Sequence, residues 1–180
     1  VLSTAGLKVK DSLWLEYMCE CERRVADSLD AYFAADRGLT EPAIARGIAG
    51  LVRESDGLFL GNSMPVRDMQ RYAQANGDRP VVFANRGVSG IDGNIATVAG
   101  AAFGAKRPIT AILGDLAALH DLNSLALLRE TCAPVVLVVL NNDGGGIFHF
   151  LPVTAHEEAF EPYFATPHGL TFESAAGMFG

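Results

Sequence analysis

ITAILGD (109–115), HDLNSLALLRE (120–130) and APVVLVVLNND (133–143) follow one another as an apolar strand, a helix and a second apolar strand. Both strand segments are continuously apolar rather than alternating, which is typical of strands that are covered on both faces. Two parallel strands need a crossover connection between them, most often a helix. This stretch therefore predicts a parallel β-sheet that carries helices on its two faces.

The same alternation continues on the N-terminal side of this stretch. Apolar strands are predicted at 58–63 and 80–87, and helices at 11–34, 41–52, 65–74 and 89–105. Thr40 has the side chain of an N-cap for the helix EPAIARGIAGLV (41–52). The last thirty residues are expected to begin as a loop and to end in a helix. The predicted fold class is α/β, with a doubly wound parallel sheet.

Composition excludes several classes of protein. Hydrophobic residues make up 49% of the chain and the mean hydropathy is +0.21, yet no apolar run reaches the roughly 20 residues that cross a bilayer. The net charge of −7 argues against a nucleic-acid partner. Three cysteines without disulfide spacing indicate a reducing compartment, and we expect a cytoplasmic protein, or a plastid one in a photosynthetic eukaryote.

Polar residues follow the two strands of the opening stretch. Asp115 ends the first strand, and Asn141 and Asn142 end the second, ahead of Asp143 and the glycines 144–146. The interval between Asp115 and Asn142 fits one helix and one strand, so both side chains should meet at one sheet edge. Carboxylate, amide and carbonyl oxygens suit Mg²⁺, and glycines let a diphosphate approach. An Asp helix cap and an Asn turn form the simpler alternative, which the joint occurrence disfavours.

The pattern that starts with GD and closes with NN resembles the thiamine-diphosphate motif, although Leu116 replaces the usual third glycine. The chain resembles one family of that superfamily, MenD, the 2-succinyl-5-enolpyruvyl-6-hydroxy-3-cyclohexene-1-carboxylate synthases. The stretches that carry the resemblance are LFLGNSMPVRD (58–68), NRGVSGIDG (85–93), GDLAALHDLNSLALLR (114–129), LNNDGGGIFHFLP (140–152) and TPHGLTFE (166–173). Residues 1–57 match only weakly.

The resemblance implies an activity and a domain organisation. MenD condenses 2-oxoglutarate with isochorismate, with loss of CO2, in menaquinone or phylloquinone biosynthesis, and uses thiamine diphosphate with Mg²⁺ or Mn²⁺. Residues 1–38 would be the end of a middle domain and a linker, and 39–180 a diphosphate domain truncated at its C-terminus. The activating glutamate would come from a pyrimidine-binding domain of another subunit in a homo-oligomer, so the isolated chain is expected to be inactive.

The resemblance also assigns roles to residues. Metal ligands would be Asp115, Asn142 and the Gly144 carbonyl. Cofactor contacts would be Asn62, Ser63, Ile91, Gly114, Asp115, Leu116, Ala117 and Asn142. Substrate contacts would be Ser63, Arg67, Arg86, Ile147 and Phe148. Arg suits carboxylate substrates because it makes two parallel hydrogen bonds.

Simpler structural roles stand beside several of these assignments. Ile91, Ile147 and Phe148 are also explained by core packing, Ser63 by helix capping, and the two arginines by surface ion pairs. No histidine is assigned a role. Three rival functions remain: another thiamine-diphosphate enzyme such as an acetohydroxyacid synthase or a 2-oxo acid decarboxylase, a non-catalytic fragment, and a nicotinamide-binding domain, which the lack of a G-x-G-x-x-G after the first strand disfavours.

Overall fold

A computed structural model describes residues 13–35, 38–74 and 79–180. The chain divides into two compact units, Val1–Leu39 and Thr40–Gly180. The first unit contributes one helix, α1 (Leu13–Ala35), and none of its residues is buried. The helix predicted at 11–34 is therefore present within the described residues. None of the described helices is both long and apolar enough to pass through a bilayer.

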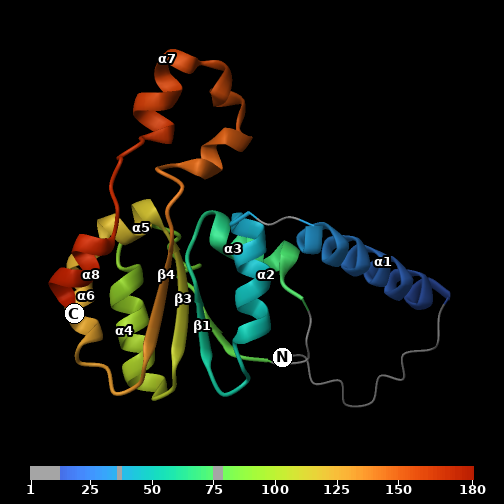
Figure 1. Ribbon diagram of the computed structural model, residues 1–180, viewed down its shortest axis with the longest axis horizontal. Coiled ribbons are helices and arrows are strands. Elements are labelled where there is room, and N and C mark those ends of the chain that lie inside the picture. The colour runs from blue at the N-terminus through green and yellow to red at the C-terminus, as the bar shows by residue number, and fades with distance from the viewer. Residues whose placement is uncertain (1–12, 36–37, 75–78) are drawn as a thin grey trace. The chain divides into compact units, whose positions relative to one another are not determined.

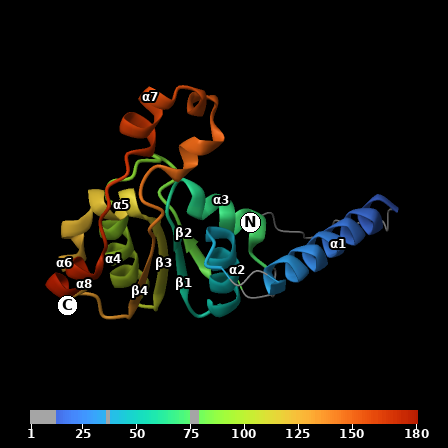
Figure 2. The ribbon, with the colours of Figure 1, turned by 45° about the horizontal axis from the view of Figure 1, so that its top comes forward.

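The second unit is built on a four-stranded parallel sheet in the order β2-β1-β3-β4 (Figures 1 and 2). Its strands are β1 (Gly57–Leu60), β2 (Val81–Phe83), β3 (Ile109–Gly114) and β4 (Val135–Leu140). In the register, Leu60 pairs with Ile112 and Gly114 with Leu140. The predicted parallel sheet is confirmed. The strand that ends just before Asp115 (β3) and the strand that ends just before the pair Asn141–Asn142 (β4) are neighbours.

Helices cover both faces of this sheet, as the doubly wound prediction requires. The helices of this unit, apart from the C-terminal turns described below, are α2 (Glu41–Leu51), α3 (Met64–Tyr72), α4 (Asn94–Ala105), α5 (Asp115–His120), α6 (Leu125–Leu128) and α8 (Glu173–Phe179). Helices α2 and α3 lie on one side of the sheet, and α4 and α6 on the other (Figure 1). The sequence order of strands and helices places them there because each crossover returns the chain to a parallel strand.

Two separate hydrophobic clusters result from this arrangement. Leu60 and Ile112 pack toward α2 and α3, whereas Phe59 and Leu113 pack toward α4. Successive strand residues point to opposite faces, so β1 and β3 contribute to both clusters. This explains why the central strands read as continuous apolar runs rather than as alternating ones.

Two predicted helices differ from the observed ones. The helix predicted at 89–105 begins only at Asn94, because Gly93 is left-handed (φ 65°) and the preceding residues form bends. The helix predicted at 120–130 is not continuous: α5 ends at His120, a 3₁₀ turn (Leu122–Ser124) follows, and α6 covers only Leu125–Leu128. The break follows from Asp121, whose buried carboxylate accepts hydrogen bonds from Ala96 N (2.9 Å) and Ser124 Oγ (2.6 Å).

The segment after β4 also differs from its prediction. A first 3₁₀ turn is Gly146–Phe150, and the part expected to begin as a loop, from Leu151 onward, forms three more short helical turns: Pro152–Ala155, α7 (Glu157–Phe160) and a π-helical turn at Glu161–Ala165. These turns lie beyond the carboxyl ends of the strands (Figures 1 and 2). Phe164 packs there against both Phe148 and Phe160. The apolar contacts among these rings supply the stability that short helices lack by themselves. The helix expected at the end of the chain is α8.

Candidate active site

A cavity of about 380 Å³ lies at the carboxyl ends of β1, β3 and β4. Open parallel sheets bind ligands at this edge. Every site residue predicted from the sequence lines the cavity: Asn62, Ser63, Arg67, Arg86, Ile91, Gly114, Asp115, Leu116, Ala117, Asn142, Gly144, Ile147 and Phe148. The structure thus brings together residues that span most of the second unit. A larger cavity of about 670 Å³ lies elsewhere, between β4, α6 and α8, and holds none of them.

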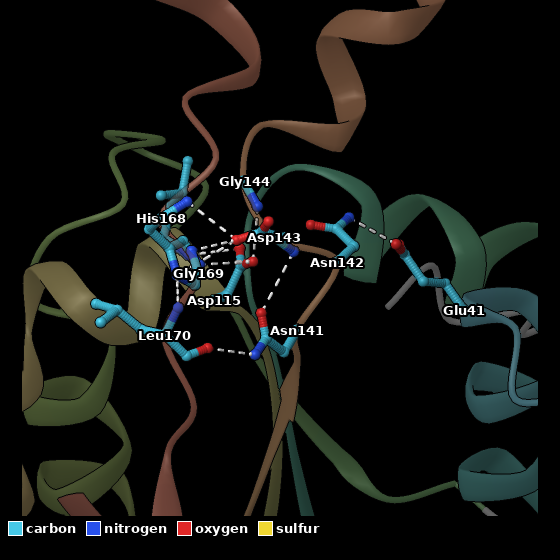
Figure 3. Close-up of polar contacts among 10 residues, drawn as sticks. Glu41, Asp115, Asn141, Asn142, Asp143, Gly144, His168, Gly169 and Leu170 are labelled. Atoms are coloured by element: carbon cyan, nitrogen blue, oxygen red, sulfur yellow. Dashed lines mark hydrogen bonds and ion pairs between the residues drawn. The ribbon is translucent and has the colours of Figure 1, made fainter. Parts of the chain in front are cut away.

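Asp115 is the best-organised side chain of the cavity. It follows β3 directly, begins α5, and is only 2% exposed. Its Oδ1 accepts a hydrogen bond from Leu116 N (2.7 Å), and its Oδ2 accepts one from Gly144 N (2.8 Å). The Nε2 atom of His168 lies 3.1 Å from the same Oδ2 (Figure 3). A buried carboxylate needs such partners, and these hold it in one orientation.

The loop after β4 carries the amide and carbonyl groups of the site. Asn142 Nδ2 donates to Glu41 Oε1 (2.7 Å), and in Figure 3 the amide oxygen points to the opposite side, toward Asp115 and Asp143. The carbonyl of Gly144 accepts Gly146 N–H (3.0 Å), so this predicted ligand has one lone pair engaged and a second one available.

Two glycines of this loop are held against another segment of backbone. A Cβ on Gly144 would overlap the carbonyl oxygen of Ala165, and a Cβ on Gly145 would overlap that of Phe164. Gly144 also adopts a φ of 131°, which side chains rarely allow. The two residues are therefore glycine because another backbone segment packs against them, which the sequence pattern by itself did not indicate.

Gly114 presents the opposite case. A Cβ at this position would meet no atom within 4 Å, and its φ of −73° is an ordinary one. Neither conformation nor internal packing requires glycine there, and the residue lines the cavity. Open space at the end of β3, beside a buried carboxylate, fits the close approach of a ligand such as a diphosphate.

Asn62 organises the opposite wall of the cavity. Its Nδ2 donates to the carbonyls of Asn85 (3.1 Å) and Gly90 (2.9 Å), while its Oδ1 accepts from Arg86 Nη1 (2.7 Å). This single buried amide joins the loop after β1 to the loop after β2 and holds the Arg86 guanidinium at the cavity. Arg67 lines the same wall, where its Nη1 donates to the Ser63 carbonyl.

Two of the simpler alternatives do not describe the observed structure. Ser63 occupies the N-cap position of α3, but its side chain makes no capping hydrogen bond, and its φ of 72° is strained for a residue with a side chain. Ile91 is 36% exposed and lines the cavity, so it is not a core residue within this chain. Both observations favour roles at the cavity.

Sequence reasoning missed two residues that contact the predicted ligands, Glu41 and His168. Glu41 was interpreted only as the first residue of a helix, and His168 was assigned no role. Neither has a local pattern that would reveal it, because each contact joins residues far apart in the chain. Four further cavity residues were also not predicted: Met64, Pro65, Ser89 and Leu140. Gly145 and Gly146 line the cavity as well, and the sequence predicted them only as glycines that let a diphosphate approach.

Most of the second unit, from Ser63 to the end of the chain, corresponds to a known family. Residues 63–180 match the family model described as "Thiamine pyrophosphate enzyme, C-terminal TPP binding domain". The chain belongs to this family. The family's description names thiamine pyrophosphate (TPP) as the ligand of this domain. The α/β fold described above agrees with this membership.

Two curated relatives of this TPP-binding domain share one functional name. The chain is 56% identical over 167 residues to the 2-succinyl-5-enolpyruvyl-6-hydroxy-3-cyclohexene-1-carboxylate synthase of Rubrobacter xylanophilus, which covers 93% of this chain. It is 50% identical over 158 residues to the enzyme of the same name from Chlorobium phaeobacteroides, which covers 87% of this chain. The chain spans 28% of the length of the first relative and 27% of the second.

A solved structure agrees with the fold. Benzoylformate decarboxylase from Polynucleobacter necessarius superposes with a TM-score of 0.63 at 19% sequence identity, over 81% of this chain and 28% of that one. At this identity the likeness concerns the arrangement of strands and helices alone.

Proposed function

We propose that the cavity binds the diphosphate end of thiamine diphosphate together with Mg²⁺. Asp115, the amide oxygen of Asn142 and the carbonyl of Gly144 would hold the metal, with phosphate oxygens and water completing its shell. Mn²⁺ would fit the same oxygens. Within the described residues no group of three or more His, Cys, Asp or Glu side chains could hold a metal. The proposed set of one carboxylate, one amide oxygen and one carbonyl carries a single negative charge. It suits a divalent ion whose remaining charge is balanced by a bound diphosphate.

The remaining cofactor contacts follow from the lining of the cavity. The backbone of Gly114, Leu116 and Ala117 would face the diphosphate, and the open space at Gly114 supports this placement. The Leu116 N–H already donates a hydrogen bond to Asp115 Oδ1. Leu116 would therefore shape the cavity wall rather than donate a hydrogen bond to the diphosphate. Asn62, Ser63 and Ile91 would contact the rest of the cofactor from the opposite wall.

We infer further that the natural protein condenses 2-oxoglutarate with isochorismate, with loss of CO2. The observation that carries this proposal is the 56% identity, over 93% of this chain, to the 2-succinyl-5-enolpyruvyl-6-hydroxy-3-cyclohexene-1-carboxylate synthase of Rubrobacter xylanophilus. When bound, thiamine diphosphate supplies the nucleophilic carbon and the electron sink. Both substrates are carboxylates, so Arg67 and Arg86 would grip and orient them through charge-assisted hydrogen bonds. Ser63 would contact substrate beside them, and Ile147 and Phe148 would form an apolar wall that excludes water.

A partner domain belongs to this proposal. Activation of the cofactor would need a glutamate from a pyrimidine-binding domain, supplied by another subunit of a homo-oligomer. We therefore expect the 180-residue chain by itself to give no turnover, although its metal and diphosphate contacts are all local.

The test is an assay of the complete natural protein with Mg²⁺, thiamine diphosphate, 2-oxoglutarate and isochorismate, followed by the loss of isochorismate absorbance. Parallel reactions replace 2-oxoglutarate by pyruvate or omit isochorismate. The expected result is turnover only with both proposed substrates. Turnover of pyruvate in their place would assign the protein to another class of thiamine-diphosphate enzyme.

A further inference from the structure

Each of the two side chains proposed to bind the metal contacts a residue outside the metal's own shell. Asn142 contacts Glu41, the first residue of α2, and Asp115 contacts His168, which lies in the segment before α8 (Figure 3). We propose that Glu41 and His168 are positioning residues that orient the two metal-binding side chains. This inference rests on the proposed function.

The contact with Glu41 decides which end of the Asn142 amide faces the site. A carboxylate accepts hydrogen bonds, so the amide nitrogen of Asn142 turns toward Glu41 at 2.7 Å. The amide oxygen must then point the other way, toward the side on which Asp115 lies (Figure 3). Among the described residues nothing donates a hydrogen bond to that oxygen, which leaves it available to a metal ion.

The contact with His168 fixes the Asp115 carboxylate in a similar manner. The backbone N–H of Leu170 donates to His168 Nδ1 at 3.0 Å, so in the neutral ring Nδ1 is an acceptor and Nε2 carries the proton. Nε2 therefore donates to Asp115 Oδ2 at 3.1 Å. The His168 side chain is 11% exposed, so this donor is largely shielded from solvent.

A set of hydrogen bonds keeps His168 in place. Asp143 Oδ1 accepts from the backbone N–H groups of His168 (3.0 Å) and Gly169 (2.7 Å). Asn141 Nδ2 donates to the carbonyl of Leu170 (2.9 Å). The loop after β4 thus binds the segment 168–170, and this segment in turn positions the carboxylate of Asp115. Asn141 and Asp143, the neighbours of the proposed ligand Asn142, form these hydrogen bonds to the segment 168–170.

Paired substitutions separate position from charge. Glu41→Gln keeps an acceptor at the same reach without the charge, whereas Glu41→Asp keeps the charge and loses the reach. His168→Gln places an amide nitrogen near the Nε2 position, whereas His168→Asn places it near Nδ1, out of reach of Asp115. Glu173→Gln, in the first turn of α8, and His156→Gln are matched controls at exposed positions.

The measurement is the Mg²⁺ affinity of the complete natural protein at fixed thiamine diphosphate, by titration calorimetry. Outer-shell substitutions typically weaken metal affinity by about 10–100-fold, and we expect losses of this order for Glu41→Asp and His168→Asn. The two Gln variants and both controls should stay near the wild type. The paramagnetic resonance spectrum of bound Mn²⁺ should change only in Glu41→Asp and His168→Asn. A general loss of stability would not change this spectrum.

Several results would overturn the inference. Wild-type affinity in both Glu41→Asp and His168→Asn would show that neither residue orients a ligand. A weaker Glu41→Gln beside an unchanged Glu41→Asp would show that the charge of Glu41 matters and not its position. If the wild type bound no Mg²⁺ with the cofactor, the metal site itself would be wrong, whereas Mg²⁺ binding without synthase turnover would overturn only the proposed reaction.

Discussion

Asp115 is the residue on which the proposed metal site depends most. Asp115→Asn should abolish Mg²⁺-dependent cofactor binding, because it removes the charge and sets an NH2 group against the N–H donors of Leu116 or Gly144. Calorimetry of cofactor binding to the complete natural protein measures this. Asp121→Asn is a matched control, since Asp121 is also buried and also accepts a backbone N–H (Ala96 N, 2.9 Å) but does not line the cavity. Unchanged affinity in Asp115→Asn would refute the assignment.

Arg67 and Arg86 should affect substrates rather than cofactor. Loss of a hydrogen bond to a charged group costs about 1.5–3 kcal/mol, so each Ala variant should lower kcat/KM by roughly tenfold to a hundredfold. Cofactor affinity should stay at the wild-type value. Arg46→Ala is the control, because Arg46 also donates to a backbone carbonyl, that of Tyr72, outside the cavity. If kcat/KM for both substrates were unchanged, the two arginines would not belong to the substrate site.

Asp68 of α3 makes stability depend on pH. Its carboxyl is 2% exposed, and among the described residues its Oδ2 has no hydrogen-bond partner. Burial raises the pKa of Asp68, the nearby Glu41 raises it further, and Arg71 opposes the shift. Because the folded state holds this proton more tightly than the unfolded chain does, stability falls as pH rises from the ordinary carboxyl pKa through the raised one.

Urea unfolding at a series of pH values tests this effect. Asp68→Asn should remove that part of the pH dependence, and Asp27→Asn, at an exposed position of α1, should leave it in place. Parallel pH curves for wild type and Asp68→Asn would contradict the expectation.

At the scale of elements, the start of α2 contributes both stability and geometry. Thr40 Oγ1 accepts a hydrogen bond from Ala43 N at 3.3 Å, as the sequence predicted, and so satisfies a free N–H of the first turn. Thr40→Ala should lower the free energy of unfolding by about 0.5–2 kcal/mol, measured by urea unfolding. Thr40→Ser keeps a hydroxyl and should stay near the wild type. Equal losses in the two variants would indicate that packing of the methyl group, not capping, is responsible.

The elements also show where local patterns fail to predict structure. The stretch 120–130 was expected to form one helix, yet it is interrupted at Asp121, whose carboxylate accepts hydrogen bonds from Ala96 N of α4 and from Ser124 Oγ. The segment after β4 contains prolines and a glycine, which are typical of a loop, yet it forms short helical turns. Tertiary contacts decide both cases, since they outweigh the small energies of local propensity.

At the scale of the whole sheet, β3 carries the two cores. Ile112 and Leu113 are adjacent but belong to different clusters, and they are 1% and 0% exposed. Ile112→Ala and Leu113→Ala should each lower the free energy of unfolding by about 2–5 kcal/mol, because each leaves a cavity on its own face. Leu170→Ala, at a side chain that is 52% exposed, should cost much less in the same urea experiment. If only one of the two core variants lost little free energy of unfolding, the face of the sheet on which that residue lies would not be a rigid core.

The sequence alone determined the parallel sheet, the order of its elements and the chemistry at its edge. Those features depend on local patterns: continuous apolar runs, turn residues, and the polar residues that follow each strand. They were sufficient to select Asp115, Asn142 and Gly144, which line one cavity, whereas the other predicted site residues followed from the resemblance to a known family. Strand ends must converge in a parallel sheet, so residue type and position along the chain determine this much.

Only the tertiary structure decided how that edge is organised. The contacts of Glu41 with Asn142 and of His168 with Asp115 join residues 101 and 53 positions apart. Gly144 and Gly145 are glycine because residues 164–165 pack against them, and Asp121 ends a helix because α4 lies beside it. No periodicity records such pairs, since each forms only after the strands and helices have packed and brought distant side chains within hydrogen-bond distance.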